Sequence, residues 1–166
     1  MIGKKMEGAL NEQIREELGS AYLYLAMAGH FAAEGWDGMA GWMRVQAAEE
    51  LEHAMRLFDH VVERGGRVKL HALAEPEAKW ASPLAAFHAA YKHEQHITAC
   101  IHGLVELAQK ENDHAAAAML QWFVSEQVEE EDHTLKAVQL LERVGSEGRG
   151  LVMADRELGR RVAEKD

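Results

Sequence analysis

The chain has 166 residues, of which 48% are hydrophobic and only two are proline, so one domain with a buried core is expected. Its formal net charge of −10 disfavours nucleic acid as a partner, because phosphate binding needs a basic surface. A single cysteine, Cys100, excludes an internal disulfide framework and fits a cytoplasmic location. The N-terminus lacks the apolar stretch of a secretory signal, and the longest apolar run, 21–33, is too short to cross a membrane.

The first half of the chain is predicted to form a hairpin of two long helices. The first spans about 6–34 and should end at Gly35, and the second should be capped by Asp37 and end at Arg64 before Gly65-Gly66. Because the joint between them is short, the two helices should be antiparallel. Residues at helical spacing predict two apolar stripes: Leu10, Ile14, Leu18, Ala21, Leu25 and Ala28, then Trp42, Val45, Ala48, Leu51, Met55, Phe58 and Val62.

The second half repeats this plan after a long connection. Residues 67–81 are long enough to run the length of a bundle, which predicts a crossover. Ser82-Pro83 predicts the start of a third helix that reaches about Glu111. A tight joint at Asn112-Asp113 leads to a fourth helix that ends at 144–145. A shorter amphipathic helix, about 146–162 with Leu151, Val152 and Leu158, should lie outside the four-helix core.

A Glu-x-x-His pair in the second helix is the first sign of a metal site. Glu50 and His53 share a helix face, although such pairs are common by chance. The spacing becomes informative because it repeats: the separation between Glu17 and Glu50 along the chain equals that between Glu94 and Gln127. One constant offset relates Glu17, Glu50, His53 and Glu49 to a matching set in the second half: Glu94, Gln127, Glu130 and Glu126.

Carboxylates that face the interior of a bundle are costly unless a cation neutralises them. Several oxygen ligands with one imidazole suit iron or manganese better than zinc. Carboxylates on two helices and paired motifs on the other two are the pattern of di-iron bundles, and the long crossover is typical of ferritin-like folds. The predicted fold class is therefore all-α, a ferritin-like four-helix bundle of about 6–144 with a short fifth helix, in one domain.

The charged run 126–132 has alternative interpretations. Taken alone, such a run is usually a solvated helix face, but the repeated spacing favours a metal centre. Glu130 and His133 form a second Glu-x-x-His pair. Because the constant offset between the two halves pairs His133 with Arg56 instead, His133 is predicted not to be a ligand. A metal-free helical scaffold would require the matched carboxylates to be accidental.

Several blocks of sequence are specific enough to indicate a family: residues 10–13, Glu17, Tyr24, residues 46–53, residues 91–94 and residues 120–131. These blocks closely resemble those of prokaryotic non-haem ferritins, and the resemblance covers nearly the whole chain, the fifth helix included. It implies a ferroxidase centre inside each subunit. In that centre Glu17 and His53 would bind a first iron, Glu50 would bridge two irons, and Glu94 and Glu130 would bind the second.

The resemblance also implies roles for residues around the two irons. Gln127 would lie beside the centre and hydrogen-bond a bound oxygen species. Tyr24 would donate electrons, and Trp122 is a further candidate for that role, with core packing as the alternative. A third iron site nearby would fall on four acidic residues: Glu49, Glu126, Glu129 and Glu130.

The implied reaction is oxidation of Fe(II) to Fe(III) by O₂ or peroxide, followed by deposition of a ferric oxide mineral inside a hollow homo-oligomeric shell of twenty-four chains. The negative charge suits the attraction of Fe(II). No haem is expected, because bacterioferritins carry their haem-binding methionine where this chain has Leu51 and Glu52. Cys100 alone cannot supply the cysteine-rich iron domain of rubrerythrins. The alternative function is a di-iron peroxidase or oxidase that stores no iron.

Overall fold

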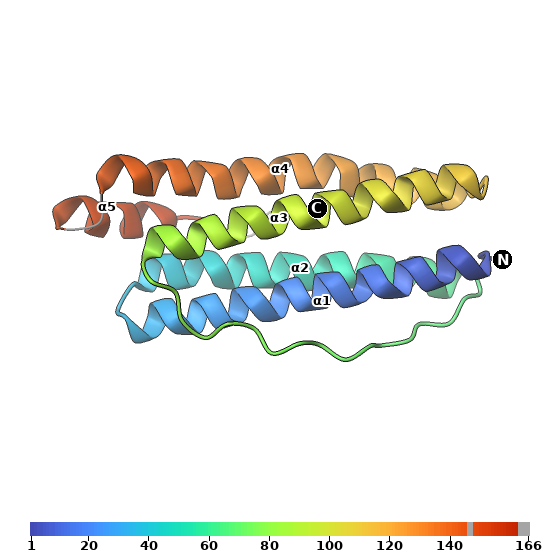
Figure 1. Ribbon diagram of the computed structural model, residues 1–166, viewed down its shortest axis with the longest axis horizontal. Coiled ribbons are helices and arrows are strands. Elements are labelled where there is room, and N and C mark those ends of the chain that lie inside the picture. Colours follow the sequence, from blue (N-terminus) through green and yellow to red (C-terminus); the bar gives the residue numbers. More distant parts are fainter. Residues whose placement is uncertain (146–147, 163–166) are drawn as a thin grey trace.

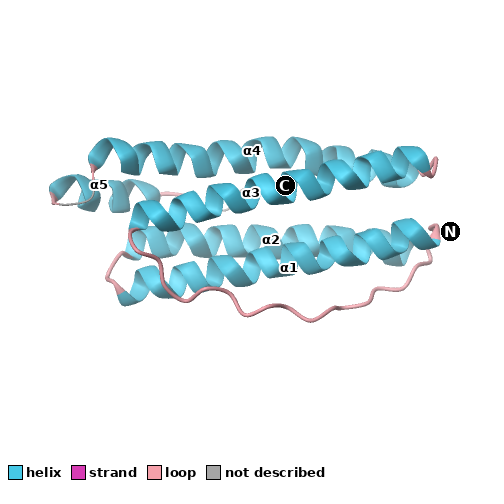
Figure 2. Ribbon diagram, viewed as in Figure 1, coloured by secondary structure: helices cyan, strands magenta, loops and turns pink. Residues whose placement is uncertain are grey.

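The computed structural model describes residues 1–145 and 148–162, and most of them are helical. Five helices follow one another: α1 (Lys4–Ala33), α2 (Asp37–Glu63), α3 (Pro83–Lys110), α4 (His114–Val144) and α5 (Arg149–Leu158). α1 packs against α2 and α3 against α4, so the four long helices form two antiparallel hairpins (Figure 1). The described residues contain no strand (Figure 2), which confirms the all-α prediction. None of their helices is long and apolar enough to cross a membrane.

The predicted crossover is also confirmed. The segment between α2 and α3 has no regular structure and runs along the outside of the bundle from one end to the other (Figure 1). It is preceded by Gly65, whose positive φ of 72° ends α2. It leads to Ser82, whose hydroxyl accepts a hydrogen bond from the Ala85 N–H, with Pro83 as the first helical residue. The sequence therefore defines both ends of the crossover correctly.

The start of α2 differs from the prediction. Asp37 is the first residue of the helix rather than its cap, and the residue before it, Trp36, makes no side-chain capping hydrogen bond. Instead, the Met39 N–H donates to Asp155 Oδ1 of α5 at 2.8 Å. A carboxylate from a distant helix thus satisfies one of the free N–H groups at this N-terminus.

The contact between α2 and α5 depends on glycine. A Cβ atom at Gly38 would lie 1.8 Å from the backbone oxygen of Asp155, and one at Gly159 would lie 2.8 Å from the Gly38 Cα. We expect Gly38→Ala to lower the free energy of unfolding by about 1–3 kcal/mol, the usual cost of overpacking. It should also increase hydrogen exchange across α5.

A matched control lies one turn further along α2. A Cβ atom at Gly41 would have no neighbour within 4 Å. Gly41→Ala should therefore leave hydrogen exchange in α5 unchanged and stabilise the helix by up to about 1 kcal/mol. Equal effects of the two substitutions would contradict the close α2–α5 contact.

The interior of the bundle has two apolar cores separated by a polar layer. One core includes Tyr24, Phe31, Met43 and Phe87 and lies toward α5, and the other includes Leu10, Leu57 and Phe123. Between them every long helix contributes buried polar side chains: Glu17 and Ser20 of α1, Gln46, Glu50 and His53 of α2, Glu94 of α3, and Gln127, Glu130 and Thr134 of α4. Such a layer is costly unless its polar atoms are partnered.

The polar layer explains why the apolar stripes were predicted incorrectly. Leu25, Leu51, Met55 and Val62 are 53%, 49%, 45% and 52% exposed. Ala48 is exposed too, and Leu18, Ala21, Val45 and Phe58 are only half-buried. The buried face of α2 runs through polar residues in its middle, so a stripe drawn through apolar residues alone turns away from the core. Leu10, Ile14, Ala28 and Trp42 are buried as predicted.

α5 contributes to the core rather than lying apart from it. Leu151, Ala154 and Leu158 are buried and complete the apolar core at this end of the bundle, where α5 packs on α2 and α4. Val152 was predicted to belong to its apolar face but is 45% exposed. The predicted start of this helix at residue 146 lies outside the described residues, and its last turn ends at Leu158 rather than near 162.

Candidate metal centre

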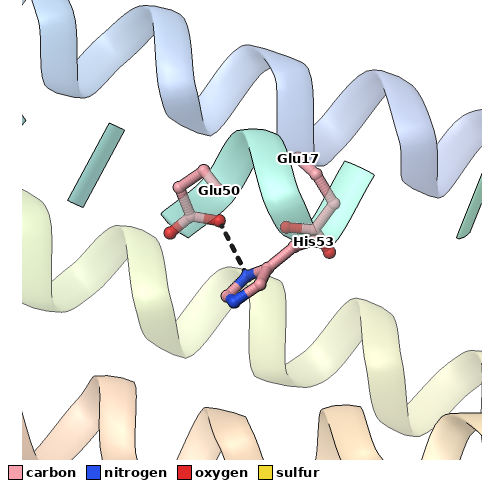
Figure 3. A group of neighbouring side chains, drawn as sticks. All are labelled: Glu17, Glu50 and His53. Carbon is pink, nitrogen blue, oxygen red and sulfur yellow. Dashed lines mark ion pairs between the residues drawn. The ribbon is translucent and has the colours of Figure 1, made fainter. Parts of the chain in front are cut away.

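Glu17 of α1 and the Glu50–His53 pair of α2 form one group of ligand atoms in the polar layer. One ligating atom of each residue lies within 4.8 Å of the others, and none of the three residues is more than 3% exposed. Figure 3 shows the three side chains converging, with His53 Nδ1 3.3 Å from Glu50 Oε2. The structure thus brings together the residues that the repeated spacing had paired.

Glu50 belongs to a second group as well. Its carboxylate lies close to those of Glu94 on α3 and Glu130 on α4, again with ligand atoms within 4.8 Å of one another. All three residues are at most 2% exposed. Glu50 is therefore the residue that these two groups share.

A third group lies on the side of α4 and reaches the surface. It consists of His53, Glu126 and Glu130, and His53 Nε2 lies 3.7 Å from Glu126 Oε1. The Glu126 side chain is 24% exposed and lines a groove between α2 and α4. This group is therefore the most exposed of the three.

Three buried atoms of the first group have no hydrogen-bond partner among the described residues: Glu17 Oε2, Glu50 Oε2 and His53 Nδ1. The approach of His53 Nδ1 to Glu50 is close enough for an ion pair but is not aligned as a hydrogen bond. Buried polar atoms almost always have partners, and three exceptions that face one another fit the coordination of a cation.

The buried carboxylates resist losing their protons when no metal is bound. Burial, followed by the charge of Glu50, raises the pKa values of Glu17 and Glu94 well above their usual range. Burial and then Glu50 also raise the pKa of Glu130, to about 8. These groups therefore hold protons that an incoming cation must displace.

Glu50 and His53 carry the opposite charges of this centre. Burial works against the ionised form of Glu50, but the nearby His53 outweighs it, so the pKa of Glu50 lies below its usual value. Burial likewise works against protonated His53, but the neighbouring Glu126 and Glu50 raise its pKa to about 11. The positive charge of the His53 imidazolium thus balances part of the negative charge of the carboxylates when no metal is bound.

Tyr24 and Gln127 support the second group of ligands. The Tyr24 hydroxyl donates a hydrogen bond to Glu94 Oε1 and is fully buried. Burial and then the charge of Glu94 raise the pKa of Tyr24 well above its usual value, so it stays protonated. Gln127 Nε2 lies 3.3 Å from Glu94 Oε2 and donates to it. Gln127 therefore orients a ligand here.

Two further glutamines hold the carboxylates, and sequence reasoning overlooked both. Gln13 Nε2 donates to Glu17 Oε1 at 2.8 Å, and Gln46 Nε2 donates to Glu50 Oε1 at 3.2 Å and to Glu130 Oε2 at 2.5 Å. The signal was present, because Gln13 and Gln46 have the same separation as Glu17 and Glu50, and each precedes its glutamate by about one helical turn. Glutamines one turn before the ligands share their helix face.

We expect Gln46→Leu to weaken binding of two divalent ions by roughly 10–100-fold, the usual effect of removing a hydrogen-bond partner from metal ligands. Gln95→Leu on the exposed face of α3 is the control. Calorimetric titration of the metal-free protein with Zn(II) measures both variants. Equal affinities would show that Gln46 does not position Glu50 and Glu130.

Some predicted residues lie apart from the three groups. Glu49 is buried and its Oε2 pairs with Arg161, and Glu129 is exposed; neither belongs to the three groups found among the described residues. His133 was predicted not to be a ligand. It lines the groove and belongs to none of the three groups found among the described residues. Arg161 itself was not anticipated.

Trp122 lies against the centre without contributing a ligand. Its ring meets the His53 ring edge-on with centroids 5.3 Å apart, and the Arg56 guanidinium lies 3.7 Å from the Trp122 centroid. The stacked Arg56 stabilises the ring electrostatically. Trp122 thus packs directly on a ligand, and its role in electron donation stays a prediction.

A four-helix bundle with a buried, shared carboxylate and a long crossover defines the class of ferritin-like carboxylate proteins. Comparison with known families agrees: the ferritin-like domain family matches residues 7–144, and the chain belongs to this family.

Individual relatives match the whole chain. A bacterial non-heme ferritin of Bacteroides fragilis is 38% identical over 161 residues, which cover 97% of this chain and 100% of that protein. A bacterial non-heme ferritin of Staphylococcus aureus is 31% identical over 166 residues, with both chains fully covered. An open-pore ferritin from Archaeoglobus fulgidus, known from its crystal structure, is 52% identical, with a TM-score of 0.96 over 98% of this chain and 100% of that one. The predicted family and fold are therefore confirmed.

Proposed function

We propose that the chain is a ferroxidase subunit that stores iron. The observation that carries this proposal is the shared position of Glu50 between two buried groups of ligands. Glu17 and His53 bind one Fe(II), Glu94 and Glu130 bind a second, and Glu50 bridges the two. The ions are substrates that are taken up, oxidised and passed on. The family's bacterial non-heme ferritins support the assignment.

The ligands favour oxidation of the bound iron. Four carboxylates and one imidazole supply mostly hard oxygen donors, which stabilise Fe(III) over Fe(II). Two Fe(II) ions held side by side deliver two electrons to one O₂, which takes up two protons and leaves as hydrogen peroxide. With peroxide as the oxidant, the two electrons and two protons instead give two water molecules.

When O₂ is instead reduced to two water molecules, it takes up four electrons and four protons. Tyr24 and a further Fe(II) then supply the two electrons that the first two Fe(II) ions do not. Its hydroxyl donates a hydrogen bond to Glu94 Oε1, so oxidation of the phenol can release its proton to that carboxylate. Gln127 keeps Glu94 in place by donating to its other oxygen. The oxidised ions leave through the third group, His53, Glu126 and Glu130, which opens on the groove.

Storage requires an enclosed space, and we propose that twenty-four copies of the chain form a shell in the cytoplasm. Large apolar side chains are exposed on the first two helices, among them Tyr22 and Leu25 of α1 and Leu51 and Met55 of α2. Contiguous exposed apolar surface is typical of protein interfaces. The chain's relatives of known structure include ferritins from Archaeoglobus fulgidus.

The proposed centre is tested by counting ions. The metal-free protein is titrated anaerobically with Fe(II), and air is then admitted while oxygen consumption is recorded. Two tightly bound Fe(II) per chain that oxidise together are expected. A chain that binds one ion, or that binds two but leaves them reduced in air, would contradict the ferroxidase assignment.

A further inference from the structure

The segment that follows α5 brings an arginine back to the metal centre. Arg161 lines the groove between α2 and α4 together with Glu49, His53, Glu126 and Glu130. Its side chain is only 13% exposed. The preceding residue, Arg160, is 77% exposed and pairs with Glu157 of α5. The two adjacent arginines therefore occupy different environments, and only one faces the centre.

Three side chains of α2 form a binding site for the Arg161 guanidinium. Nη2 lies 2.6 Å from Glu49 Oε2, and Nη1 donates to Gln46 Oε1 at 2.5 Å. The guanidinium carbon lies 4.4 Å from the centroid of the Trp42 ring. A carboxylate, an amide oxygen and an aromatic face together satisfy the charge, the donors and the planar face of the group.

This site is connected directly to the ligands. The same Gln46 that accepts from Arg161 donates to Glu50 and to Glu130. Arg161 is therefore linked through Gln46 to a residue that belongs to both the second and the third ligand group.

We infer that Arg161 is a tethered cation that competes with a third metal ion for a groove-side position beside Glu126 and Glu130. While Arg161 is in place, it pairs with Glu49 and adds a positive charge to the groove. An ion that binds there must displace Arg161 or tolerate its repulsion. Arg161 thus makes the third position weaker than the two buried ones, so that ions pass through it instead of staying. This inference rests on the proposed metal centre.

The test uses the full-length, assembled protein and Zn(II), a divalent ion that is not oxidised. Calorimetric titration compares the wild type with Arg161→Ala, Arg161→Lys and the control Arg160→Ala. We expect two tight ions in all four proteins and a third, weaker ion in the wild type. In Arg161→Ala the third ion should bind at least about 10-fold more tightly, a typical size for coupling between two sites. Arg161→Lys, which keeps the charge, and Arg160→Ala should resemble the wild type.

Coupling between two sites is reciprocal, which gives a second measurement. Hydrogen exchange of the segment 149–162 in the wild type should stay unchanged while the first two ions bind and rise when the third binds. The inference would be overturned if Arg161→Ala and Arg160→Ala bound the third Zn(II) with equal affinity. It would also be overturned if hydrogen exchange of 149–162 did not change when the third ion binds. Either result would leave the two-ion centre intact. If the wild type does not bind two Zn(II) ions tightly, both this inference and the proposed metal centre are wrong.

Discussion

Glu50→Gln is expected to abolish rapid oxidation of Fe(II). Glu50 is the one residue common to the Glu17 and Glu94 groups, and it is 1% exposed. Glutamine keeps the size of the side chain but removes the charge that both ions share. The rate should therefore fall by more than the roughly 10–100-fold that loss of an outer hydrogen-bond partner costs. Stopped-flow absorbance of the oxidised iron measures the effect.

The control for this substitution is Glu106→Gln on the exposed face of α3. It makes the same chemical change at a distance from the ligands and should leave the rate unchanged. Zn(II) titration adds an independent test, because Glu50→Gln should reduce the number of tightly bound ions from two to one or none. A Glu50→Gln variant that oxidises iron at the wild-type rate would remove the bridging role.

The stability of the metal-free protein is expected to fall as the pH rises from 6 to 9. The folded protein raises the pKa of Glu130 to about 8 and of His53 to about 11, while their usual values are 4.5 and 6.5. A group whose pKa is higher in the folded than in the unfolded state favours folding most at a pH below its unfolded pKa. This contribution to stability is lost as the pH rises from the unfolded pKa through the folded pKa. Glu50, whose pKa is lowered, is ionised in both states throughout this range and adds no slope.

The expected slope is about 1.4 kcal/mol per pH unit for each additional proton held by the folded state. Thermal unfolding in a chelator at several pH values measures it, and Glu130→Gln should reduce it while Glu106→Gln does not. Zn(II) should reverse the trend, because it replaces those protons and binds more tightly at higher pH. At a free Zn(II) concentration 100 times the Kd, each site adds about 2.7 kcal/mol. A metal-free protein that is equally stable at pH 6 and pH 9 would contradict this description of the centre.

The convergence of the buried carboxylates and His53 could be predicted from the sequence because helices impose a fixed spacing. Glu50 and His53 share a face by their separation alone, and the repeated offset to Glu17 and Glu94 places four helices around one point. The crossover and the caps at Ser82 and Gly65 were likewise local signals.

Features that depend on tertiary contacts were not predictable in this way. The buried face of α2 was misplaced because Gln46, Glu50 and His53 occupy core positions that an apolar pattern assigns to solvent. Asp155 reaches the N-terminus of α2 from a helix near the other end of the chain. Arg161 depends on the path of the chain after α5, and nothing in its neighbouring residues distinguishes it from Arg160.

Iron retention tests the central claim most directly. Excess Fe(II) is added in air at neutral pH, the mixture is separated by size exclusion, and the iron that elutes with the protein is measured. A large particle that holds far more ferric iron per chain than its ligand groups can bind is the predicted result. A small species that saturates at two or three irons per chain would contradict storage and indicate a di-iron redox enzyme instead.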